Sequence, residues 1–125
     1  MRTISFEETL QFFKYFLPEL LNTGFAGPIK KYFENGNEDI HKGLKFFYDN
    51  LNNGKSVNDS IKSMNPRFHI VIRNLFILGM ENSNIDFVLQ DIINILETKK
   101  NNEREKELYV LHEKFSNKSD NKILS

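Results

Sequence analysis

Three apolar runs that each close near a glycine decide the fold of this chain: FKYFLPELLNTG (residues 13–24), LNNGKSV (residues 51–57) and LFILGME (residues 75–81). Glycine adopts the left-handed backbone conformation at little steric cost, so it is a common residue just beyond the end of a helix. We therefore interpret Gly24, Gly54 and Gly79 as helix stops. Their spacing predicts a chain of short helices joined by tight corners.

The sequence before residue 54 contains three candidate helices. Ser5 and Glu8 have the spacing of a capping box, and apolar residues follow at helical intervals. Pro18 falls inside this first run, so we expect a kink or a break there. A short second helix is expected over residues 28–35, with its proline at the first position. Asn37 then caps a third helix, which has acidic residues in its first turn.

Three further helices are expected after residue 54. Ser56 caps a short fourth helix. Residues 68–78 are apolar nearly all round, which favours a central helix; a buried strand is the rival interpretation, and the length of the run favours the helix. Residues 85–96 repeat apolar side chains at helical spacing. The sequence thus predicts an all-α protein with six helices between about Ser5 and Lys100.

The character of the chain changes beyond residue 97. The stretch TKKNNEREKE (residues 98–107) is charged and lacks a core pattern, so it is either a solvated helix extension or the start of disorder. Leu108, Tyr109 and Leu111 offer a weak docking stripe, and a frayed tail is expected from Ser116 onward. We therefore predict a helical domain over residues 1–100 and a charged stalk or disordered tail over residues 101–125.

Length and composition narrow the function classes. A chain of 125 residues fits one domain. Its 17 basic and 17 acidic residues balance, which removes the main support for nucleic-acid binding. It has no cysteine, so disulfides and thiolate metal sites are excluded. No apolar run approaches the roughly 20 residues of a membrane span, and the N-terminus does not resemble a signal peptide. The chain remains compatible with being a piece of a membrane protein.

No catalytic, cofactor or metal site is expected, and we interpret the protein as not being an enzyme. His41, His69 and His112 lack a second ligand at zinc-like spacing, with only Glu113 beside the last of them. The paired acids all fall in the first turns of expected helices, where the helix dipole explains them. The glycines lie too far apart to form a phosphate-binding loop.

The aromatic residues are more numerous than one buried helix face accommodates. The chain has 12 phenylalanines, and consecutive helical residues point about 100° apart. We expect Phe12, Phe16, Phe46 and Tyr48 to lie off the main core stripes, and at least two of them to form a self-association or partner interface. A homodimer is therefore expected. The alternative is that a kink at Pro18 turns all the rings into one core.

The order of these features resembles the cytoplasmic domain of type II secretion F-type platform proteins, which are inner-membrane components of type II secretion systems and type IV pilus machines. The resemblance spans about Leu10 to Leu96. It is carried by four motifs: Phe13, Leu17, Leu20-Leu21 and Gly24; Gly54-Lys55-Ser56-Val57; Pro66-Arg67-Phe68; and Gly79-Met80-Glu81-Asn82-Ser83-Asn84-Ile85. The chain departs from the family pattern at Pro18, and in the last motif Met80 replaces a glutamate, Asn82 a serine and Ser83 a second glycine.

The resemblance implies a compact bundle of six antiparallel helices, often paired as a dimer, at the cytoplasmic face of the bacterial inner membrane. It implies a non-enzymatic scaffold between the cytoplasmic assembly ATPase, other platform proteins and the pilin subunits. The family carries this domain twice, with membrane helices after each copy. The chain is then expected to be a piece that stops before the first membrane helix. A stand-alone helical adaptor or regulator that binds a partner helix is the alternative.

Overall fold

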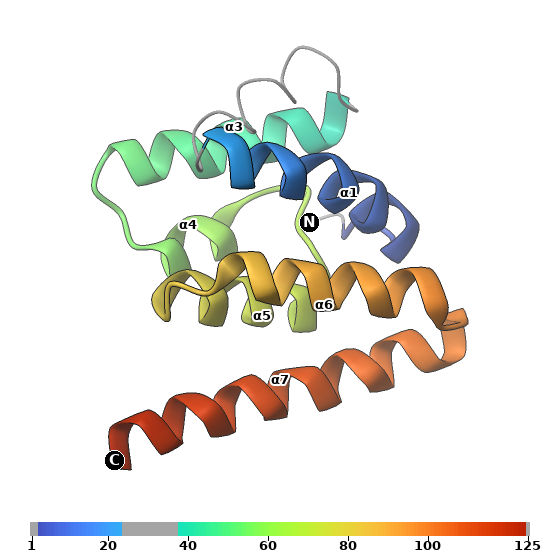
Figure 1. Ribbon diagram of the computed structural model, residues 1–125. Coiled ribbons are helices and arrows are strands. Elements are labelled where there is room, and N and C mark those ends of the chain that lie inside the picture. The colour runs from blue at the N-terminus through green and yellow to red at the C-terminus, as the bar shows by residue number, and fades with distance from the viewer. Residues whose placement is uncertain (1–2, 24–37, 125) are drawn as a thin grey trace. The chain divides into compact units, whose positions relative to one another are not determined.

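The computed structural model describes residues 3–23 and 38–124, and six helices lie in these ranges (Figure 1). They are α1 (Phe6–Thr23), α3 (Glu38–Asn52), α4 (Val57–Ser63), α5 (Ile70–Glu81), α6 (Ile85–Thr98) and α7 (Asn101–Leu124). The β-type pairing in the described ranges is an isolated bridge between Thr3 and Arg67. The predicted all-α class is confirmed for this part of the chain. The expected stop at Gly24, the cap at Asn37 and the short helix over residues 28–35 lie outside the described residues.

The chain forms two compact units, Met1–His69 and Ile70–Ser125. The first contains α1, α3 and α4, and the second contains α5, α6 and α7. The division lies directly before α5, not near residue 100, where the sequence predicted the end of the helical domain. The reason is that α7 packs against both α5 and α6, so residues 101–124 belong to a packed unit and are not a separate stalk.

Helix α1 begins with the predicted capping box. The backbone N–H of Glu8 donates to Ser5 Oγ at 3.1 Å, and the backbone N–H of Ser5 donates to Glu8 Oε1 at 3.4 Å. The helix then continues through Pro18 to Thr23, so the break expected at Pro18 does not occur. Pro18 and Lys14, one turn earlier, are both exposed, which lets water reach the backbone where proline removes a helical hydrogen bond.

Three phenylalanine rings form the best-defined core cluster of the first unit. Phe12 and Phe13 of α1 and Phe68 are each no more than 2% exposed. The ring centroids lie 5.4 Å apart between Phe12 and Phe13, 5.7 Å between Phe12 and Phe68, and 5.3 Å between Phe13 and Phe68. These are the distances at which tilted aromatic rings attract one another beyond simple burial. Phe68 therefore connects the segment before α5 to α1.

Helix α3 ends in a Schellman motif centred on Gly54. Its φ of 86° places Gly54 in the left-handed region. The N–H of Gly54 donates to the carbonyl of Leu51 at 3.1 Å, and the N–H of Lys55 donates to that of Asn50 at 3.0 Å. Two residues later, Ser56 Oγ accepts from the backbone N–H of Asp59 at 3.0 Å and so caps α4. One short corner therefore ends one helix and starts the next.

We expect Gly54→Ala to lower the free energy of unfolding by about 1 kcal/mol, because a Cβ atom is unfavourable at positive φ. A Cβ at Gly54 would meet no atom within 4 Å, so the loss should be conformational and not steric. Urea unfolding followed by circular dichroism measures it. Ser83→Gly is the matched control: Ser83 has a φ of 56°, so glycine there should stabilise the protein. Equal stability of Gly54→Ala and the wild type would contradict this account.

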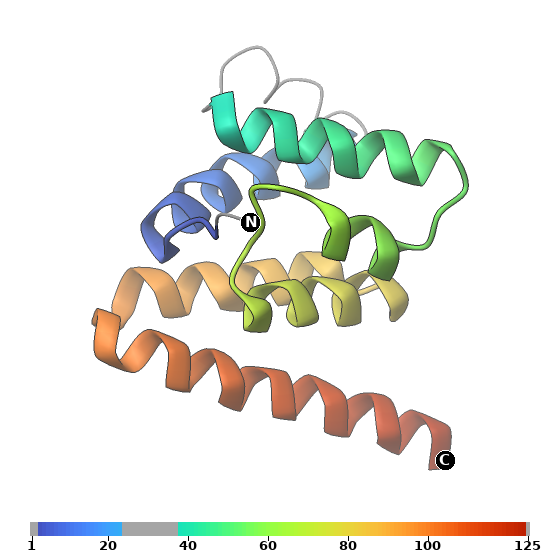
Figure 2. The ribbon, with the colours of Figure 1, turned by 180° about the vertical axis from the view of Figure 1, so that it is seen from behind.

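The second unit is built from three helices in which α6 runs antiparallel to both α5 and α7 (Figure 1, Figure 2). Helix α5 packs against α6 and α7, and α6 packs against α7. The central run over residues 68–78 is thus confirmed as helical from Ile70 onward, and the strand alternative is excluded. Apolar side chains at helical spacing are buried on all three helices: Val71, Ile72, Leu75, Phe76, Val88, Leu89, Ile92, Leu96, Leu108, Leu111 and Phe115.

Gly79 is not the stop of α5, contrary to the prediction. The helix continues to Glu81, and the left-handed position falls on Ser83. The N–H of Asn84 donates to the carbonyl of Gly79 at 2.9 Å, which is the closing bond of a Schellman motif. Gly79 instead permits close packing: a Cβ there would lie 2.9 Å from Ile85 Cδ1 and 3.0 Å from Ile85 Cα. The absence of a side chain lets α5 and the start of α6 approach each other.

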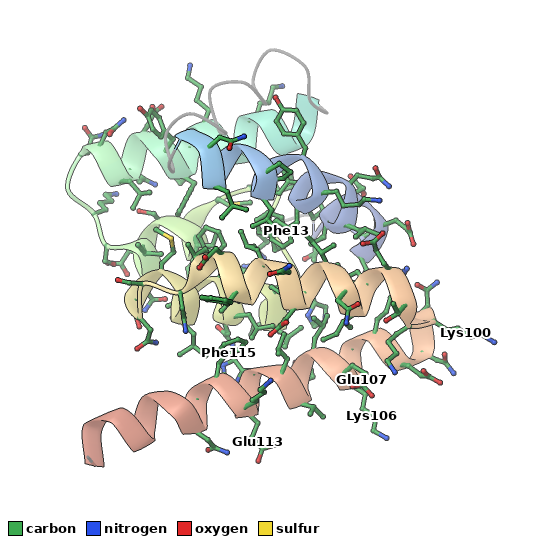
Figure 3. The ribbon with its side chains drawn as sticks, viewed as in Figure 1. Phe13, Lys100, Lys106, Glu107, Glu113 and Phe115 are labelled. Atoms are coloured by element: carbon green, nitrogen blue, oxygen red, sulfur yellow. The ribbon has the colours of Figure 1, made fainter. Side chains whose placement is uncertain are left out.

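Helix α7 has a buried face, although its charged sequence predicted no core residues in its first turns. Arg104 is 8% exposed, Leu108 is fully buried, and Leu111 and Phe115 are each 7% exposed. Their spacing of four, three and four residues places them on one face of a helix. The stretch after residue 97 is therefore neither core-less nor disordered over its described length. Figure 3 shows Phe115 projecting from α7 toward the side on which α5 and α6 lie, as this stripe requires.

Candidate interaction surfaces

The four aromatic residues predicted to form an interface have different environments. Phe12 is 2% exposed and belongs to the ring cluster with Phe13 and Phe68, so its assignment to an interface was wrong. The reason is a tertiary contact, because the Phe68 ring lies 5.7 Å from the Phe12 ring and 5.3 Å from the Phe13 ring. Phe16 lies in α1, but its side chain is outside the described part of the structure.

Phe46 and Tyr48 lie on α3 around a buried neighbour. Phe47 is 1% exposed and faces the core, whereas Phe46 is 44% exposed and Tyr48 is half-buried. Adjacent helical residues point about 100° apart, so burying Phe47 turns Phe46 toward solvent. Phe46 is therefore available to a partner, and Tyr48 is available in part.

Within the described part of the chain, five other large apolar side chains are exposed, and sequence reasoning did not identify them as surface residues. Leu21 lies near the end of α1, and the second unit exposes Ile70 at the start of α5 and Phe87 in the first turn of α6. Tyr109 and Val110 are adjacent on α7 and are 47% and 54% exposed. The signal for this last pair was available, since both fall outside the stripe defined by Leu108 and its helical neighbours.

The histidines do not assemble into a site in the described part of the chain. The His69 ring contacts the Phe6 ring in a tilted arrangement, with centroids 5.2 Å apart, and His112 is half-buried on α7. His41 lies on α3, and its side chain is outside the described part. Within residues 3–23 and 38–124, no three histidine, aspartate or glutamate side chains gather closely enough to hold a metal ion.

Arg104 is a buried cation in the described part of the second unit, and its hydrogen bonds hold the corner between α6 and α7. Its Nη2 donates to the carbonyl of Leu96 at 2.5 Å, and its Nε donates to that of Lys99 at 3.1 Å. Its Nη1 donates to Asn101 Oδ1 at 2.6 Å. The last carbonyls of a helix lack intrahelical partners and carry partial negative charge, so a guanidinium there is doubly favoured. The role of this residue is structural.

Helices long and apolar enough to cross a membrane are not found among those described. Comparison of the chain with models of known protein families, with curated proteins and with solved structures gives no match.

Proposed function

We propose that this chain is a non-enzymatic interaction domain, and specifically a scaffold domain of the inner-membrane platform of a type IV pilus or type II secretion machine. In this proposal it lies at the cytoplasmic face of the bacterial inner membrane. Its partners are the cytoplasmic assembly ATPase and other platform proteins. The full-length protein continues into membrane-spanning segments.

The observation that carries the proposal is the corner between α3 and α4. Gly54 ends α3 in the left-handed conformation, and Ser56 caps α4 through the backbone N–H of Asp59. The Gly-x-Ser sequence of this chain, which resembles that of the platform family, therefore has a structural role. It ends one helix and starts the next within three residues. Its place between two short helices supports the resemblance.

The Gly79 turn supports the resemblance less well. Its glycine lies inside α5, and Met80 stands where the family has an acid. Glu81 is exposed at the last position of α5 and is the nearest acid to that place. In the proposal, Glu81 supplies the contact that the family makes one residue earlier.

A stand-alone helical adaptor is the second candidate. It is favoured by the exposure of Leu21 on α1 and Phe46 on α3, since apolar anchors of this kind dock onto the apolar face of a partner helix. The complete open reading frame distinguishes the two candidates. The platform requires membrane spans and a second Gly-x-Ser corner downstream. A reading frame that stops near Ser125 would contradict the platform and favour the adaptor.

Phe46→Ser should weaken binding to the assembly ATPase of the same organism by about tenfold or more, because exposed aromatic anchors dominate interface energies. Isothermal titration of the ATPase with each variant measures the effect. Lys45→Ser is the matched control, since Lys45 is the exposed neighbour of Phe46 on α3. Circular dichroism confirms that both variants fold. Equal affinity of the Phe46→Ser variant and the wild type would remove Phe46 from the interface.

A further inference from the structure

The outward face of α7 combines an exposed apolar pair with charges of both signs. Tyr109 and Val110 are about half exposed, and Glu103, Lys106, Glu113 and Lys114 are all exposed around them. Lys106 and Glu113 project from the side of α7 that faces away from α6 (Figure 3). This face is opposite the buried stripe that includes Leu108, so its side chains remain exposed to solvent.

The charges on this face are arranged symmetrically about the apolar pair. Lys106 lies three residues before Tyr109, and Glu113 lies three residues after Val110. At about 100° per residue, Lys106 and Glu113 fall on nearly the same line along the helix. An antiparallel copy of α7, related by a two-fold axis between Tyr109 and Val110, therefore places Lys106 of each chain opposite Glu113 of the other.

The same arrangement brings further complementary groups together. A two-fold axis at this point sets Tyr109 against its own copy and Val110 against its own copy. On the flank beside Val110, Lys114 of one chain lies near Glu103 of the other, within about one helical turn. Each contact occurs twice, because a two-fold interface uses the same patch on both chains.

A parallel pairing of the same faces gives the opposite result. It would place Lys106 against Lys106 and Glu113 against Glu113, and like charges directly opposite one another are destabilising. The charge pattern thus favours the antiparallel orientation of the two copies. We propose that α7 mediates antiparallel self-association of this protein through Tyr109, Val110 and reciprocal Lys106–Glu113 ion pairs. This inference does not depend on the proposed function.

The dimer should be weak and sensitive to salt. The apolar part of the interface is small, and exposed ion pairs are screened as ionic strength rises. Sedimentation equilibrium of the full 125-residue chain at low and high sodium chloride concentration is the first measurement. We expect dimers at high micromolar concentration in low salt and weaker association in high salt. A chain that stays monomeric throughout would overturn the proposal.

Charge reversal tests the register directly. Lys106→Glu and Glu113→Lys should each weaken self-association by about tenfold or more, because each creates two like-charge contacts in the dimer. The double variant should recover the wild-type association constant. An equimolar mixture of the two single variants should associate as a heterodimer, since every contact is then complementary.

The charge-reversed variants also distinguish this interface from one formed by Phe46. A dimer that is unchanged by both single reversals, and by high salt, would overturn the assignment to α7. Failure of the mixed variants to associate would do the same. Because the mixture and the double variant restore the contact, a loss caused by misfolding cannot imitate the expected pattern.

Discussion

Replacing Arg104 with methionine is expected to lower the free energy of unfolding by about 3 kcal/mol. Each charge-assisted hydrogen bond contributes roughly 1.5–3 kcal/mol, and losses within one network are not additive. The variant keeps much of the side-chain volume but leaves the carbonyls of Leu96 and Lys99 and the side chain of Asn101 without this donor. The affected groups lie at the corner between α6 and α7, so the loss should loosen the attachment of α7.

Urea unfolding followed by circular dichroism measures the loss, with two control variants. Arg104→Lys keeps the charge but not the planar fork of donors, so it should fall between methionine and the wild type. Lys100→Met removes a charge from an exposed side chain near the same corner (Figure 3), and it should change stability by less than about 0.5 kcal/mol. Equal stability of Arg104→Met and Lys100→Met would show that the buried hydrogen bonds contribute little.

Features fixed by neighbouring residues could be predicted from the sequence. The caps at Ser5 and Ser56 are made by bonds that span three residues, so the local pattern is sufficient to find them. The left-handed position of Gly54 is predictable for the same reason, since its neighbours within the same turn form the motif. The helical state of α5 followed from the length of its apolar run.

Features fixed by contacts between helices could not be predicted in this way. Gly79 is needed because Ile85 packs closely against it, and not because it ends α5. The helix ends two residues after Gly79, at Glu81. Phe12 is buried because Phe68, more than fifty residues away, contacts its ring. The local pattern around either residue contains no information about these partners.

The buried face of α7 was not predicted, because the residues at its start are mostly charged. The acidic and basic residues between 98 and 107 suggest a solvated segment, yet Arg104 faces inward because its guanidinium satisfies helix-end carbonyls. A search for apolar periodicity assigns every arginine to the solvent-exposed face, so it misses Arg104. The spacing of Arg104, Leu108, Leu111 and Phe115 has the period of a helix face, and it reveals the stripe once an arginine is allowed within it.

The candidate interface was predictable only in outline. An excess of aromatic side chains indicated that some would remain exposed, and Phe46 is one of them. Which ring is exposed depends on the tertiary partner of each helix face. Phe46 is exposed and Phe12 is buried for this reason, although each has another phenylalanine next to it in the sequence.

Gly79→Val is expected to lower the free energy of unfolding by about 3 kcal/mol, at the upper end of what overpacking of a tight contact typically costs. The first atom of any side chain at this position would lie 2.9 Å from Ile85 Cδ1, 3.0 Å from Ile85 Cα and 3.2 Å from Val88 Cγ2. The methyl group of Ile85 can turn aside, but its Cα belongs to the backbone of α6. The two helices must therefore separate, and the buried contacts beside them weaken.

Gly79→Ala tests whether the residue is a packing glycine or a helix stop. Inside a helix, alanine gains roughly 1 kcal/mol of propensity over glycine, so its net loss should be smaller than that of valine. If the loss is steric, adding Ile85→Val, which removes the Cδ1 atom at 2.9 Å, should recover part of it. A helix stop would give no such coupling, because its cost arises from the backbone conformation alone. Urea unfolding of the two single variants and the double variant completes the cycle. Additive losses would contradict the packing role, and a coupling energy near 1 kcal/mol would agree with it.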